Sequence, residues 1–79
     1  MAESIYEFLG WVGILLVLGA YALLSFGILA SDSLFYHGLN LFGAIGIIVD
    51  AVTDKNYQPA VLNVVWAGIA IFGLVNVII

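Results

Sequence analysis

The sequence predicts an all-α integral membrane protein, a bundle of three transmembrane helices joined by short loops. Asp, Glu, Lys and Arg are absent from three long runs, residues 8–31, 33–49 and 56–79. A helix needs about 20 apolar residues to cross a hydrocarbon core of roughly 30 Å. The second run reaches that length when Asp50 lies at the headgroup level. The chain is also 66% hydrophobic, more than a soluble fold of 79 residues can bury.

The first expected span covers about residues 5–30. Glu3 and Glu7 precede it or lie in its first turns, where acidic groups favour the positive end of the helix dipole. A cleavable signal peptide would begin with basic residues and carry a shorter apolar core. The first span is therefore expected to stay in the mature protein.

The second and third spans are expected at about residues 33–53 and 59–79, and residues 1–79 form a single transmembrane domain. Asp32 or Ser33 can cap the second span, because either side-chain oxygen can accept a hydrogen bond from a free helical N–H. Pro59 opens the third span, where a missing N–H costs little. Three spans place the termini on opposite faces, and Lys55, the single Lys or Arg, weakly favours a cytoplasmic N-terminus.

Helices in a membrane associate through close contact of small residues and through interhelical hydrogen bonds. In the first span, Gly13, Ala20 and Gly27 recur every seven residues and line one stripe. The second and third spans add small residues on the faces assigned to the bundle interior. The expected helix-packing residues are Gly13, Ala20, Gly27, Gly43, Ala67 and Ala70.

Polar residues within the spans are expected to form interhelical contacts: Ser25, Asn40, Asp50, Asn63 and Asn76. The 1.5 Å rise per residue gives their depths. By depth, Asn40 is expected to pair with Ser25 or Asn76, and Asp50 with Asn63. An alternative is that Asn40 or Asn63 contacts a substrate. Trp66 lies too deep for an interfacial belt, so it fills a groove between helices, donates its N–H to a carbonyl, or contacts a ligand.

The sequence offers little support for a catalytic or metal-binding site, and no enzymatic activity is expected. Cysteine is absent, which excludes disulfides and thiolate ligands. His37 is the single histidine and has no second metal ligand of a suitable kind nearby. Six charged side chains cannot form a nucleic-acid surface. No cofactor is predicted; bound lipid is expected, and a pigment or quinone only through proximity to other subunits.

Two strings carry a family resemblance, Leu39-Asn40-Leu41-Phe42-Gly43-Ala44-Ile45-Gly46 and Pro59-Ala60-Val61-Leu62-Asn63-Val64-Val65-Trp66-Ala67. Together with Tyr21-Ala22-Leu23-Leu24-Ser25-Phe26-Gly27, they resemble a family of small three-helix proteins of the bacterial inner membrane. The resemblance implies a multi-pass protein of that membrane. It brings no established activity.

More distantly, the layout resembles the PQ-loop, or SemiSWEET, triple-helix bundle of homodimeric sugar transporters. That likeness implies that the third span packs between the first two, and that Asn63 matches a pocket-lining asparagine. The chain departs from the pattern because Pro59 is its single proline and the second span has no tryptophan.

Two functions remain open at this point. The leading hypothesis is a non-enzymatic accessory subunit that packs laterally against lipid and a larger membrane complex of respiratory or photosynthetic type. The short loops leave lateral helix contact as the main surface. The alternative is a homodimeric SemiSWEET-like carrier of a small neutral solute, with Asn40, Asn63 and Trp66 lining a cavity between two copies.

Overall fold

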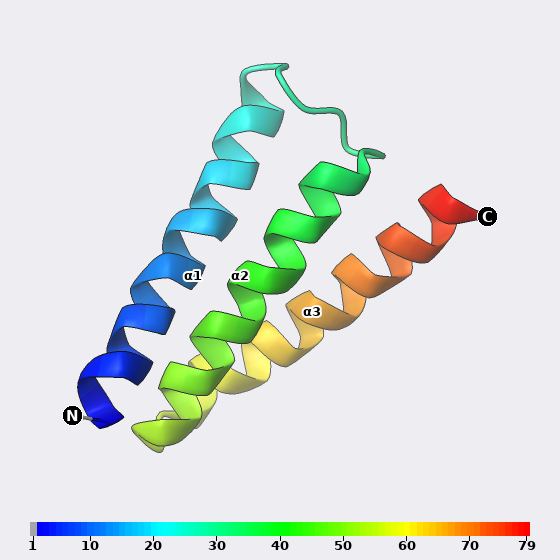
Figure 1. The fold of residues 1–79 in the computed structure, drawn as a ribbon. Helices are drawn as coiled ribbons and strands as arrows, with labels where there is room; N and C mark the ends of the chain where they lie inside the picture. Colours follow the sequence, from blue (N-terminus) through cyan, green and yellow to red (C-terminus); the bar gives the residue numbers. More distant parts are fainter. Residues whose placement is uncertain (1) are drawn as a thin grey trace.

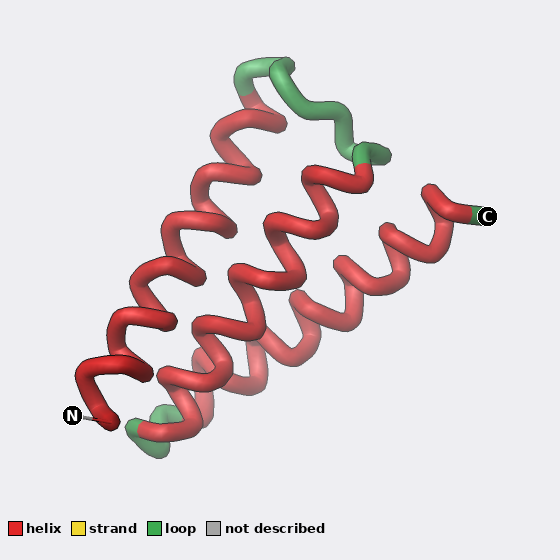
Figure 2. Tube along the Cα trace, in the orientation of Figure 1, coloured by secondary structure: helices red, strands yellow, loops and turns green. Residues whose placement is uncertain are grey.

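Three α-helices make up the fold: α1 (Ala2–Ser25), α2 (Leu34–Thr53) and α3 (Tyr57–Ile78) (Figure 1). The computed structural model describes residues 2–79, with side chains from residue 5 onward. Short connections join the helices, and the described chain has no strand (Figure 2). All three helices are long and apolar enough to cross a membrane. The predicted all-α three-helix bundle is confirmed.

Helix α2 is the central element of the bundle. It packs against both α1 and α3, whereas the backbones of α1 and α3 do not approach each other among the described residues. Helix α3 runs at an angle to the other two (Figure 1). The order implied by the PQ-loop likeness, with the third span in the middle, is therefore wrong.

The first helix ends at Ser25, five residues before the expected end of the first span. The Gly27 N–H donates to the Leu24 carbonyl at 3.0 Å, and the Ile28 N–H donates to the Leu23 carbonyl at 2.9 Å. This pair of bonds is a Schellman motif, which requires a left-handed residue at its centre. Gly27 supplies it with φ of 79°. The assignment of Gly27 as a helix-packing residue is wrong, because it lies outside the helix and a Cβ added there would meet no atom within 4 Å.

Ser33 caps the second helix, so of the two predicted candidates, Asp32 and Ser33, the serine is the N-cap residue. Its Oγ accepts hydrogen bonds from the Phe35 N–H at 3.1 Å and the Tyr36 N–H at 3.3 Å. The cap satisfies N–H groups that have no partner within the helix. Asp32 is thereby left with no capping role.

The third helix begins at Tyr57, so Pro59 is its third residue rather than its first. Its ring is still tolerated there, because the first N–H groups of a helix have no intrahelical partner. The connection turns sharply at Lys55, which has φ of 57°. The Asn56 N–H then donates to the Ala51 carbonyl at 2.8 Å and closes the end of α2.

Helices α1 and α2 meet through glycines. A Cβ added at Gly13 would lie against the Gly43 carbonyl oxygen, and one added at Gly43 would lie 2.8 Å from the Gly13 carbonyl oxygen. A Cβ at Gly46 would lie 2.6 Å from the Leu9 carbonyl oxygen. The two backbones thus touch over about one helical turn. Dispersion between closely packed backbones holds membrane helices together, because lipid offers no hydrophobic drive.

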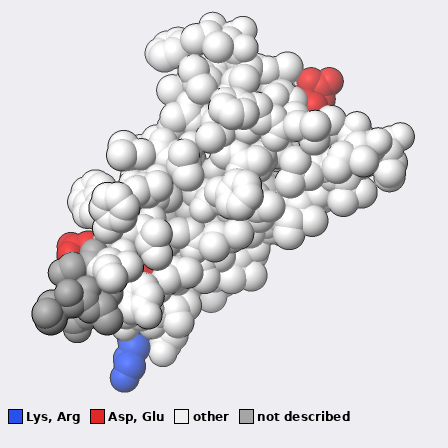
Figure 3. Space-filling model, in the orientation of Figure 1, with Lys and Arg blue, Asp and Glu red and all other residues white. Residues whose placement is uncertain are grey.

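The interior of the bundle consists of small residues and two asparagines. Ala20 and Ala44 are fully buried, and no large side chain is fully buried in the described part. Large aliphatic and aromatic side chains instead cover the outside. Charged atoms gather near the two ends of the molecule, with an uncharged surface between them (Figure 3). This distribution suits a bilayer, where apolar side chains face lipid and charges reach the headgroups.

Candidate functional site

One hydrogen bond joins two side chains on different helices in the described part of the chain. The Trp66 Nε1–H of α3 donates to Asn40 Oδ1 of α2 at 3.0 Å. Asn40 also donates through Nδ2 to the Tyr36 carbonyl at 3.0 Å, within its own helix. Asn40 is only 5% exposed, so this amide is a structural group with both ends occupied. Its predicted pairing with Ser25 or Asn76 is wrong.

That pairing failed for two physical reasons. Ser25 is the last residue of α1 and is exposed. Asn76 lies near the end of α3, on an exposed position beside the first loop. Depth alone ignored the tilt of α3 and the length of the tryptophan side chain, whose indole reaches further than an amide.

A groove of about 280 Å³ opens between α1 and α3, where these two helices fail to meet. We call it the α1/α3 groove. Its base is Ile47 of α2, and its α3 wall contains Asn63 and Trp66. The remaining lining residues are apolar: Ile14, Val17, Leu18 and Leu62.

Asn63 is the polar residue of the α1/α3 groove and is 8% exposed. Its Nδ2 donates to the Pro59 carbonyl at 2.8 Å, and no described residue donates to its Oδ1. The described part contains no fully buried side-chain N or O atom without a partner, so this oxygen is not completely enclosed. An amide oxygen about 9 Å along a membrane helix is costly to leave without a donor.

Asp50 contacts α1 rather than Asn63. Its carboxylate lies where a Cβ on Gly10 would be, so glycine at that position makes room for the side chain. No described hydrogen bond joins Asp50 to Asn63, and the expected pair is wrong. Asp50 lies about one turn from the end of α2, where its carboxylate can reach the headgroup region.

Of the remaining expected packing residues, Gly13, Ala20, Gly43 and Ala70 are buried, and Ala67 is half-buried. Gly13 and Gly43 face each other across α1 and α2. Gly10 and Gly46 also lie in that interface and were missed. A signal was present, since Gly10-x-x-Gly13 and Gly43-x-x-Gly46 share one spacing in the two helices.

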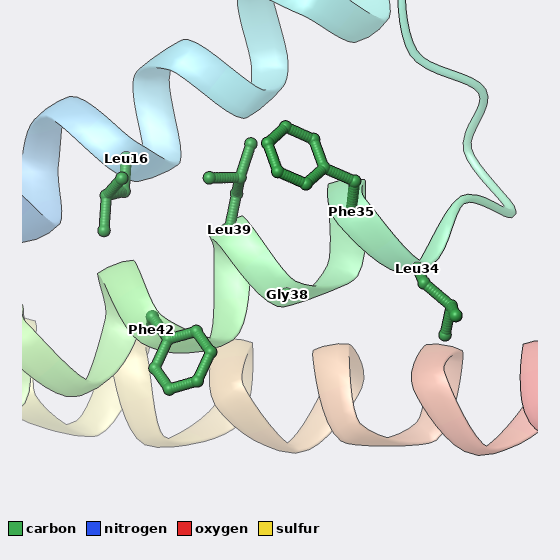
Figure 4. A pocket seen from close by; sticks show the side chains of 6 residues that line it. All are labelled: Leu16, Leu34, Phe35, Gly38, Leu39 and Phe42. Carbon is green, nitrogen blue, oxygen red and sulfur yellow. The ribbon is translucent and has the colours of Figure 1, made fainter.

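A larger groove of about 630 Å³, lined by apolar residues, lies along α2 beside Leu16 of α1 (Figure 4). Phe35 and Leu39 project toward α1, Leu34 and Phe42 project away from it, and Gly38 lies between them. A Cβ on Gly38 would meet no atom within 4 Å. None of the lining side chains can form a hydrogen bond to a polar ligand, so lipid acyl chains are the expected contact of this groove.

The described residues contain no cluster of metal ligands. No group of three His, Asp or Glu side chains lies close enough together to hold a metal ion. His37 lies edge-on to the Tyr36 ring, with centroids 5.3 Å apart. It also packs over Gly73 of α3, where a Cβ would collide with the imidazole.

These features define the class: a small multi-pass membrane protein with three candidate spans, packed by glycines on one side and by polar side chains on the other. Residues 6–79 match the model of one protein family. The chain therefore belongs to that family, which has no assigned activity. No similar curated protein and no similar solved structure was found. The PQ-loop likeness thus gains no support from a known structure.

Proposed function

We propose that the protein is a non-enzymatic accessory subunit of the bacterial inner membrane, which binds a transmembrane helix of a larger complex in its α1/α3 groove. The observation that carries the proposal is Asn63 in the lining of this groove, with an Oδ1 that accepts no hydrogen bond from a described residue. Polar atoms inside a membrane usually pair with another helix. A partner helix with a hydroxyl or amide donor at this depth would satisfy the oxygen.

The shape of the bundle supports the same proposal. The backbones of α1 and α3 flank α2 and stay apart from each other, so the groove has two walls and a base that a partner protein can contact. The short loops offer little surface outside the membrane. Lateral helix contact is therefore the main way in which this chain can recognise another protein.

Site-specific photocrosslinking in native membranes tests the proposal. A photoreactive residue at Leu62, inside the groove, should capture one membrane protein in a stoichiometric product. The same residue at exposed Ile71, outside the groove, should not. Asn63→Leu should reduce the Leu62 product, whereas Asn76→Leu on the same helix should leave it unchanged. Native mass analysis that finds only a free monomer or homodimer would contradict the proposal.

A second candidate is a homodimeric carrier of a small neutral solute. It is favoured by one observation, the presence of Asn63 and Trp66 in the same groove of about 280 Å³. Asn40 is not proposed as a solute ligand, because its amide already forms hydrogen bonds with the Trp66 indole and the Tyr36 carbonyl. Proteoliposome uptake should then fall in Asn63→Ala. Uptake equal to that of the unchanged protein would remove this candidate.

A further inference from the structure

A pocket of about 460 Å³ lies at the end of the bundle that contains the first loop and the end of α3. Four polar side chains from three separate segments line it: Ser31 and Asp32 of the loop, His37 of α2 and Asn76 of α3. Its volume is within the usual range for small-ligand sites, about 300 to 1,000 Å³. None of the sequence patterns brought these four residues together.

The charge of this pocket is set by Asp32. Lys55, the single Lys or Arg, lies beyond the other end of α2, about 30 Å away at 1.5 Å per residue. No lysine or arginine can therefore neutralise the Asp32 carboxylate. Since the chain carries a formal net charge of −4, an anionic ligand is disfavoured and a cationic group is favoured here.

Polarity in the pocket changes with depth. Asn76 lies near the end of α3, whereas Ile69 lies two turns deeper and lines the same pocket with Phe72. Ser31 and Asp32 lie in the loop at the membrane surface. The pocket is thus polar where headgroups lie and apolar where acyl chains begin, which matches the polarity of a phospholipid.

We propose that this pocket binds the headgroup of an aminophospholipid of the phosphatidylethanolamine type. The primary ammonium donates hydrogen bonds to the Asp32 carboxylate, a charge-assisted contact that a trimethylammonium cannot form. Donors from Asn76, Ser31 and His37 surround the adjoining phosphate. Ile69 and Phe72 contact the first part of an acyl chain. This site is separate from the α1/α3 groove and does not depend on the proposed accessory function.

Native mass spectrometry of the full chain in detergent tests the site. The protein is offered equal amounts of phosphatidylethanolamine, phosphatidylcholine and phosphatidylglycerol with identical acyl chains. The unchanged protein should retain phosphatidylethanolamine severalfold more than either competitor. Asp32→Asn should bring the three lipids to similar retention, and Asn76→Leu should lower phosphatidylethanolamine retention. Since Ser33 rather than Asp32 caps α2, the Asp32 variant should keep its helical circular dichroism.

Asp54→Asn is the matched control, because it removes the same charge at the opposite end of α2. It should leave the preference unchanged. Equal retention of all three lipids by the unchanged protein, or an equal loss in both aspartate variants, would overturn the proposal. Glycerophosphoethanolamine, which lacks acyl chains, should bind far more weakly than the lipid. Equal binding of this soluble headgroup would overturn the lipid assignment.

Discussion

The two faces of α2 hold their neighbours by different means. Against α1, backbone lies on backbone, with Gly13 and Gly43 opposite each other. Against α3, the contacts run through side chains: the Trp66 indole bonds the Asn40 amide, and His37 packs over Gly73. The first interface depends on the absence of side chains, and the second on their presence.

This difference indicates how well each interface can accommodate an added atom. An atom added at Gly13 meets backbone, which moves only when the whole helix moves. An atom added at Gly73 meets the imidazole of His37, which can rotate about its own bonds. We therefore expect the α1–α2 interface to be rigid and the α2–α3 interface to adapt.

The largest expected effect comes from Gly13→Ala. The new Cβ would collide with the Gly43 carbonyl oxygen, and overpacking of this kind costs about 1 to 3 kcal/mol. Gly19→Ala is the matched control on the same helix, where a Cβ meets no atom within 4 Å. It should be neutral or stabilise by up to about 1 kcal/mol through helix propensity. Thermal unfolding in detergent measures the stability of both variants. Equal stability would contradict the prediction that the α1–α2 interface is rigid.

The second prediction tests the role of Gly27 as the residue that ends α1. Gly27→Ala should destabilise by about 1 kcal/mol, because alanine resists the left-handed conformation that the turn requires. Gly27→Asn should cost less, since asparagine tolerates that conformation. Denaturation in detergent compares the two. If Gly27 packed against a helix instead, the larger asparagine would be the more harmful change.

Gly27 also shows what sequence reasoning could and could not reach. Length and hydropathy predicted the three helices, because each span must satisfy its backbone hydrogen bonds within itself. The seven-residue recurrence of Gly13, Ala20 and Gly27 then predicted a common stripe. Two of these residues are buried, but the third ends the helix. Spacing alone does not distinguish a packing glycine from a capping glycine.

The polar contacts were harder to predict for a different reason. Depth along each helix was estimated as if all three helices were parallel, whereas α3 is inclined to the others (Figure 1). That estimate paired Asp50 with Asn63, but Asp50 lies against Gly10 of α1. The PQ-loop likeness, separately, implied that the third span packs between the other two. The order of the helices follows from the contacts of α2, which no single-helix pattern contains.

The third prediction tests the side-chain character of the α2–α3 interface. Trp66→Phe keeps an aromatic ring but removes the donor to Asn40 Oδ1. Hydrogen bonds between membrane helices contribute about 0.6 kcal/mol on average and up to about 1.7 kcal/mol. We expect a loss in this range because Asn40 is buried. Trp11→Phe, at a residue 60% exposed, should change the unfolding free energy much less.

A double-mutant cycle with Asn40→Leu isolates this bond. The two changes should be less harmful together than the sum of their separate effects, because both remove the same interaction. Additive effects would show that the indole contributes through packing alone. The α2–α3 interface would then resemble the α1–α2 interface more closely than proposed.

The smallest effect is expected from Gly73→Ala, and it bears most directly on whether α3 can adapt. The new Cβ displaces the His37 ring, and an off-rotamer side chain costs about 0.5 to 1.5 kcal/mol. We expect the lower end, because the ring borders open pockets on α3 into which it can turn.

A His37→Ala background removes the imidazole that the new Cβ would meet, so Gly73→Ala should become neutral or slightly stabilising there. Gly68→Ala, where a Cβ meets no atom within 4 Å, should be neutral in both backgrounds. Stability measured for the four combinations of the His37 and Gly73 changes gives their coupling energy directly. A Gly73→Ala penalty that persists without His37 would mean that backbone, rather than a movable ring, limits the approach of α3.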